Sequence, residues 1–218
     1  MLPSYPSVVT ELPAPLRERK KQRTRQALID SALELFTARG FADVTLDELC
    51  DGVDVSKRTF FRNFVSKEDV AMAPLQDMWL AVLAELETAE NPGRTLLTLL
   101  EECLVAALDR IGDEEWARRA RQSHRLAQNT PSMDAHNREF CERTTRALLE
   151  IAHRRFDVGA LDDPRPRLAA DMLVSAFHYA IEGWGAGTAR PDSADLAARV
   201  RTAVAALPGS LTLTAIPR

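Results

Sequence analysis

Three signals for the start of a helix follow one another between residues 45 and 67, and they constrain the fold of this chain more than any other feature. Thr45, with Glu48 three residues later, matches a capping box, in which each side chain accepts a hydrogen bond from the other residue's backbone N–H. Ser56 and Ser66 are of the type that caps a helix start through the side-chain oxygen. The sequence therefore predicts helices that begin near residues 46, 57 and 67.

The first two of these helices are separated by a very short connection, Gly52-Val53-Asp54. Gly and Asp tolerate the positive φ angles that a tight turn requires. Two helices joined in this way form a helix-turn-helix, whose second helix can enter the major groove of DNA.

The second helix of this motif carries side chains suited to a DNA groove. Its first turn holds Lys57, Arg58 and Thr59, at the place where such helices meet base edges. Arg and Lys can donate hydrogen bonds to guanine, and a Thr methyl group can contact a thymine methyl group. We expect Phe60 and Phe64, four residues apart, to anchor the opposite face of the helix in its own domain. The alternative is a solvated basic helix in an all-α protein.

A basic segment precedes the motif. The net charge of the chain is −4, yet the stretch from Arg17 to Arg25 holds six basic residues and one acidic residue, which gives it a charge of about +5. Such an arm directs DNA to one edge of a protein and contacts phosphates. Lys67, at a helix start, also suits a phosphate, and any one of these cations could instead be only solvated. The predicted DNA surface consists of Arg23, Arg25, Thr45, Ser56, Lys57, Arg58, Thr59, Phe61, Arg62, Asn63 and Lys67.

Residues from about 25 to 70 resemble the DNA-binding domain of TetR/AcrR-type transcriptional regulators. The matching segments are Ala32–Phe36, Gly40-Phe41, Thr45–Leu49, Val55–Phe64 and Ser66–Asp69. The chain departs from the family pattern at three positions. Asp54 stands where the family often has Gly, Cys50 where it often has Ala, and Phe61 where it often has a Tyr that contacts a phosphate. Phe61 lacks the hydroxyl group for that hydrogen bond.

The resemblance implies an all-α, dimeric regulator with an N-terminal three-helix helix-turn-helix domain and a C-terminal helical bundle for ligand binding and dimerisation. It implies a repressor that binds a palindromic operator in double-stranded DNA as a homodimer. A small apolar or amphipathic effector would release it by shifting the fourth helix. Two alternatives stay open, namely an activator and a ligand-independent regulator whose bundle docks a protein partner.

Apolar periodicity predicts the remaining helices. The first should run from about residue 18 to 39 and end at Gly40, which supplies a left-handed residue. The others are expected at about 67–90, 94–111, 113–129, 132–156, 166–186 and 193–207. We divide the chain into an extension (1–16), a DNA-binding domain (17–66), a ligand-binding and dimerisation domain (67–207) and an irregular tail (208–218).

The resemblance implies that the last two helices pair with those of a second copy in a four-helix dimer interface. A twofold dimer can read two DNA half-sites about 34 Å apart or a multiple of that distance, which agrees with this arrangement. The residues assigned to this interface are Leu173, Ile181, Trp184, Leu196, Val200 and Val204. The candidates for an effector pocket are Met78, Trp79, Cys103, Trp116, Phe140, Phe177, His178 and Glu182. The alternative for each pocket candidate is an ordinary place in the core. His178 and Glu182 could also form a polar pair in the pocket or across the dimer interface.

The sequence contains no motif for several classes of function. The four histidines show no metal-ligand spacing, and no catalytic triad, phosphate loop or dinucleotide fingerprint occurs. We therefore expect no metal, no cofactor and no enzymatic activity. No signal peptide and no apolar run of about 18–20 residues appears, so we expect no membrane association. Three widely spaced cysteines suggest a reducing cytoplasm, with a redox-sensing role as the alternative.

Overall fold

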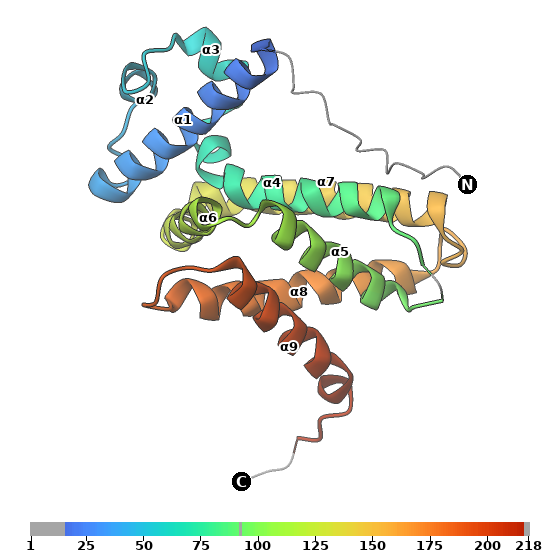
Figure 1. Ribbon diagram of the computed structural model, residues 1–218. Coiled ribbons are helices and arrows are strands. Elements are labelled where there is room, and N and C mark those ends of the chain that lie inside the picture. Colours follow the sequence, from blue (N-terminus) through green and yellow to red (C-terminus); the bar gives the residue numbers. More distant parts are fainter. Residues whose placement is uncertain (1–15, 92, 216–218) are drawn as a thin grey trace, which may run out of the picture.

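The computed structural model describes residues 16–91 and 93–215, and all regular structure in these ranges is α-helical (Figure 1). The first three helices are α1 (Leu16–Arg39), α2 (Leu46–Asp51) and α3 (Lys57–Phe61). They are followed by α4 (Lys67–Thr88), α5 (Leu96–Ile111), α6 (Glu114–Ala127), α7 (Pro131–Arg155), α8 (Pro164–Ala186) and α9 (Ser193–Leu211). In Figure 1, α1–α3 occupy one end of the molecule, α8 and α9 occupy the other, and α4–α7 lie between them. The predicted all-α fold is confirmed.

The three predicted helix starts are confirmed by their caps. The Glu48 N–H donates to Thr45 Oγ1 at 3.3 Å, and the Thr45 N–H donates to the Glu48 carboxylate at 2.8 Å, which completes the capping box. Ser56 Oγ accepts from the Thr59 N–H at 3.2 Å, and Ser66 Oγ accepts from the Asp69 N–H at 3.2 Å. Because these bonds are local in sequence, they could be predicted without knowledge of the tertiary structure.

The turn between α2 and α3 uses its residues differently from what we expected. Asp54 has φ 52° and takes the left-handed conformation, which Asp tolerates better than most residues. Gly52 has φ −59°, so the turn does not use its conformational freedom. A Cβ atom at Gly52 would lie 2.9 Å from Ser31 Oγ, so this glycine instead allows α1 and α2 to pack closely.

At the end of α1 the predicted stop is confirmed. Gly40 has φ 90° and donates to the Phe36 carbonyl at 2.9 Å. The Phe41 ring folds back on Phe36 with a centroid distance of 4.7 Å. Phe36 and Phe60 are almost completely buried, and both belong to the hydrophobic core.

The C-terminal bundle is centred on α4, which packs against α5 and α7, while α8 packs against α9. Its core includes the six residues that we assigned to the dimer interface. Leu173, Ile181, Trp184, Leu196, Val200 and Val204 are all buried within one chain. In this single chain the apolar stripes of α8 and α9 face inward, and the contact of these six residues with a second copy stays a prediction.

Two helix boundaries differ from the predictions because of proline. The helix expected from about residue 166 begins at Pro164, with Asp163 as the N-cap. At the first position of a helix the missing N–H of proline costs nothing. Pro208 was expected to begin an irregular tail, yet α9 continues through it to Leu211. Near an exposed helix end, water can satisfy the carbonyl that loses its partner. Of the expected extension, only Leu16 lies in the described residues, and it begins α1.

No helix in ranges 16–91 and 93–215 combines the length and the apolar character that a membrane span requires.

Candidate functional site

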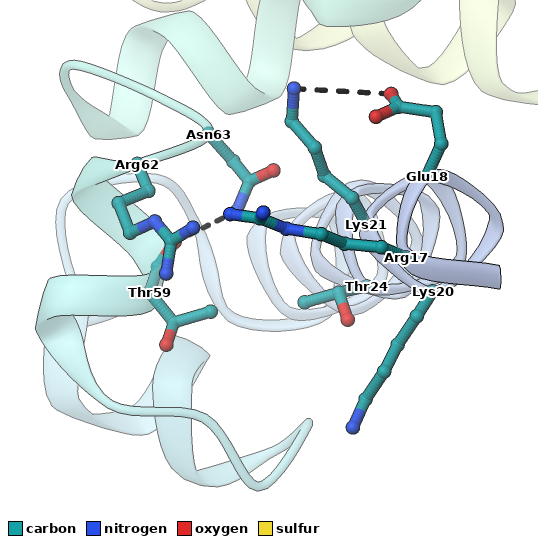
Figure 2. Close-up of a pocket in the computed structure, with 8 residues that line it drawn as sticks. All are labelled: Arg17, Glu18, Lys20, Lys21, Thr24, Thr59, Arg62 and Asn63. Carbon is teal, nitrogen blue, oxygen red and sulfur yellow. Dashed lines mark hydrogen bonds and ion pairs between the residues drawn. The ribbon is translucent and has the colours of Figure 1, made fainter. Parts of the chain in front are cut away.

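A basic hollow of about 380 Å³ separates the start of α1 from α3. Its lining includes four cations, Arg17, Lys20, Lys21 and Arg62, and one carboxylate, Glu18. In Figure 2 the Arg17 side chain extends from α1 towards α3, whereas Lys21 turns towards Glu18. A concave surface with this excess of positive charge is suited to the phosphate backbone of a nucleic acid.

Helix α3 presents its first turn to solvent beside this hollow. Lys57 and Arg58 are exposed, and Phe61 is 56% exposed, whereas Phe60 is completely buried. The Lys57 ammonium forms an ion pair with Asp47 of α2 at 2.8 Å. The hydrogen bond to Asp47 raises the pKa of Lys57. The buried face of α3 thus fixes the helix, and its outer face carries groups that can reach base edges.

The structure gives Arg25 a different role from the phosphate contact that we expected. Its guanidinium group makes two hydrogen bonds to Asp77 of α4, at 2.6 and 2.8 Å, and lies 5.0 Å from the centroid of the Phe64 ring. These bonds connect α1 to α4. Arg25 therefore holds the DNA-binding domain on the bundle and is removed from the proposed DNA surface.

The Lys67 side chain also bonds to other groups of the protein. Its ammonium group donates to the carbonyl oxygens of Phe41 and Val44 at 2.9 and 2.6 Å, and it lies 4.7 Å from the centroid of the Phe41 ring. It ties the start of α4 to the loop after α1, in place of the phosphate contact that the sequence suggested. The ring and the carbonyl groups belong to residues far from Lys67 in sequence, so only the tertiary structure could show this.

Three polar candidates serve α2 and α3 themselves. Thr45 and Ser56 are the N-caps described above. The Asn63 amide donates to the Thr59 carbonyl at 2.8 Å and so caps the end of α3. These residues shape the recognition helix, which leaves six candidates for contact with DNA, namely Arg23, Lys57, Arg58, Thr59, Phe61 and Arg62.

The residues of α1 that we predicted to contact DNA do not include those that line the hollow. Arg17, Lys20, Lys21 and Thr24 line it, whereas the predicted surface took Arg23 and Arg25 from this arm. The sequence did indicate a basic surface here, through the basic segment from Arg17 to Arg25. Which of its side chains face α3 depends on how α1 packs.

A second set of ion pairs joins the DNA-binding domain to the bundle. Asp30 of α1 accepts hydrogen bonds from Arg119 of α6 at 2.6 and 3.0 Å and from Arg118 at 3.3 Å. The Arg119 side chain is only 16% exposed. Solvent therefore screens this pair less than a pair at the open surface.

The bundle contains a cleft of about 230 Å³ bounded by α4, α6, α7 and α8. Trp79, Phe177, His178 and Glu182 line it, as we expected of an effector pocket. Phe140 lines a much smaller apolar cavity that shares Trp79 with the cleft. The structure thus brings five of the predicted pocket residues into one region.

Three predicted pocket residues do not line this cleft or the small cavity. Met78 and Cys103 are buried in the core. The Trp116 indole N–H donates to the Pro74 carbonyl at 3.0 Å and holds α6 against α4. For these three the alternative of an ordinary core position applies, because a helical apolar stripe cannot distinguish core from pocket wall. The cleft also includes His124 of α6, which the pocket prediction omitted.

A further finding concerns metal ligands. Within residues 16–91 and 93–215, no group of three or more His, Cys, Asp or Glu side chains is arranged to hold a metal ion. The cysteines Cys50, Cys103 and Cys141 are free thiols, and burial raises the pKa of each.

Comparison with known proteins places this architecture in a family. Residues 28–73 match the family model "Bacterial regulatory proteins, tetR family". The HTH-type transcriptional regulator TcmR of Streptomyces glaucescens is 38% identical over 176 residues, which cover 78% of this chain and 76% of TcmR. The chain belongs to the TetR family of DNA-binding transcriptional regulators, and it is not an enzyme.

Two solved structures show the same fold at low sequence identity. SmeT, the repressor of the multidrug efflux pump SmeDEF of Stenotrophomonas maltophilia, is 21% identical, with a TM-score of 0.51 over 85% of this chain and 91% of SmeT. FadR of Thermus thermophilus, a TetR-family repressor, is 21% identical, with a TM-score of 0.50 over 89% of this chain and 98% of FadR.

Proposed function

We propose that this protein is a repressor that reads a palindromic operator as a homodimer and is released by a small effector bound in the cleft of the bundle. The observation that carries the proposal is the exposed first turn of α3 next to the basic hollow. Phosphate contacts from α1 would set the affinity and the position on the duplex. Lys57, Arg58 and Arg62 would select the sequence.

A second copy is proposed to cover the outer face of α8 and α9. This face is rich in small exposed residues, including Gly183, Ala198 and Thr202, and Tyr179 on it is 74% exposed. These residues border an open hollow of about 500 Å³. Small side chains allow helices of two copies to approach closely, and a twofold arrangement gives two recognition helices for two half-sites.

The effector role rests on the position of the cleft. Its wall includes residues of α4 and α6, and both helices also hold α1 through ion pairs, at Asp77 and at Arg119. A ligand that moves either helix would therefore shift the recognition helices. SmeT is known in complex with triclosan and FadR in complex with lauroyl-CoA. This supports effector control, and the cleft favours a small ligand over a protein partner.

The energy that such control requires is modest. A ligand can shift the two states only by the difference in its affinity for them. A 100-fold loss of operator affinity corresponds to about 2.7 kcal/mol of coupling. Such coupling would pass through the ion pairs that α4 and α6 make with α1, at Asp77 and at Arg119.

The test is selection of bound sequences from a random DNA pool by the purified protein. We expect a palindrome whose half-sites are about one helical turn, or a multiple of it, apart. Absence of enrichment at moderate salt, also after unfolding and refolding without small molecules, would contradict sequence-specific binding. Transcription from a reporter promoter that carries the selected site, measured with and without the protein, then distinguishes a repressor from an activator.

A further inference from the structure

The apolar wall of the cleft is aromatic. Trp79 of α4 and Phe177 of α8 meet edge to face, with ring centroids 5.1 Å apart and an interplanar angle of 75°. Met72, Leu75 and Ile181 extend this wall. Flat aromatic ligands pack well against such a surface, because rings favour offset and edge-to-face contacts.

Two imidazole groups line the cleft beside this wall. Partial burial lowers the pKa of both His124 and His178, which favours the neutral form of each ring. The His124 ring packs against α8, where a Cβ atom at Gly185 would clash with it. Its Nε2 atom is buried and has no hydrogen-bond partner in the described part of the chain. This atom lies against α8 at Gly185, so it is covered by the protein and does not face the cleft.

The charged groups at the cleft are acidic. Glu182 has no ion-pair partner among residues 16–91 and 93–215, whereas Asp134 is paired with Arg138 at 2.7 Å. Among the described residues that line the cleft, none is Lys or Arg. An anion that entered would lose water without gaining a counter-charge and would face the Glu182 carboxylate.

We propose that the cleft takes an aromatic effector whose polar end donates hydrogen bonds and carries no negative charge, such as a phenol, an alcohol or a protonated amine. Glu182 accepts from this polar end, and Trp79 and Phe177 hold the ring. This inference rests on the proposal that the cleft is the effector site.

The test compares three ligands with one ring system and different polar ends. Full-length protein without DNA is titrated by calorimetry with 2-naphthylmethylamine, 2-naphthalenemethanol and 2-naphthoate. We expect the amine to bind most tightly and the carboxylate about tenfold more weakly than the amine, which corresponds to about 1.4 kcal/mol. Equal affinities, tighter binding of the carboxylate, or no binding of any of the three would overturn the proposal.

Two matched variants test whether Glu182 causes the preference for the amine over the carboxylate. Glu182→Gln keeps the shape and removes the charge, so the ratio of amine to carboxylate affinity should fall towards one. Glu150→Gln, the same change at an exposed position of α7 that does not line the cleft, should leave the ratio unchanged. A ratio that survives Glu182→Gln would overturn the role of Glu182.

A second variant controls for disturbed assembly, because Glu182 also borders the outer face of α8 and α9. Trp79→Leu lies on α4, away from that face, and should weaken all three ligands alike while their order remains. If Trp79→Leu changed the order of the three affinities, or if all three ligands bound it as tightly as wild type, the proposed placement of the ring would be contradicted. Sedimentation of each variant reports its oligomeric state.

Operator binding separates this inference from the proposed function. If the order of the three ligands holds but none of them changes operator occupancy, effector release fails and the ligand class stands. If an unrelated compound releases the operator while the order fails, effector control stands and the ligand class fails.

Discussion

The hollow between α1 and α3 and the cleft in the bundle are similar in size and opposite in chemistry. The hollow has a volume of about 380 Å³ and is lined by four cations and one carboxylate. The cleft has a volume of about 230 Å³, and among the described residues of its wall the charged ones are Asp134 and Glu182. On our proposals, one acidic protein attracts a polyanion at the hollow and disfavours anions in the cleft. The local charge differs between the hollow and the cleft, and the net charge of the chain predicts neither of them.

The largest expected effect tests whether α3 reads bases. Arg58→Ala should weaken operator binding by about 1–3 kcal/mol and relax the preference at one position of each half-site, while binding to random DNA changes little. Fluorescence anisotropy on both DNAs measures this. Arg143→Ala, at an exposed site on α7, is the matched control. Equal losses on operator and random DNA would show that Arg58 contacts only the backbone.

The next effect concerns the connection between the two regions. Asp30→Asn weakens the charge-assisted bonds to Arg119 and Arg118 and should lower the free energy of unfolding by about 1–2 kcal/mol. It should also reduce the effect of a bound ligand on operator affinity, because α6 loses its hold on α1. Urea unfolding and operator titration with and without ligand check both outcomes. Asp109→Asn, on the exposed side of α5, should leave both quantities unchanged, and full coupling in Asp30→Asn would assign the connection to α4 alone.

A smaller and more uniform effect is expected for the basic hollow. Lys20→Ala should weaken operator and random DNA by the same factor and reduce the salt slope of binding by about 1, because one phosphate contact and its counterion are lost. Titrations at several salt concentrations measure the slope. An unchanged slope would mean that Lys20 lies outside the DNA footprint.

The smallest effect is a pH dependence within the DNA-binding domain. Hydrogen bonds from the Thr45 N–H and from Arg39 lower the pKa of Glu48 to about 2. Because the folded pKa lies below the unfolded one, of about 4.3, this carboxylate stabilises the fold above the unfolded pKa, and the contribution is lost as pH falls towards 2. The stability difference between wild type and Glu48→Gln should therefore shrink in that range. A difference that stays constant from pH 7 to pH 2 would contradict this.

Much of the DNA-binding domain could be predicted because its signals are local. The caps at Thr45, Ser56 and Ser66 act within four residues, and the stop at Gly40 acts through its own backbone. Such bonds form whenever the segment is helical, so residue types at fixed spacing are sufficient evidence. The same holds for the helical bundle, where apolar periodicity gave the helices but not their partners.

The sequence by itself determined the helices, their starts, the helix-turn-helix and the basic character of the first helix. Only the tertiary structure decided how long side chains are used. It placed Arg25 on Asp77, Lys67 on the carbonyl groups after α1, and the apolar stripes of α8 and α9 inside one chain. It also brought His124 to the wall of the cleft. The physical reason is range: a cap or a periodic stripe depends on neighbours in sequence, whereas an ion pair, a pocket wall or an interface depends on which distant surfaces meet.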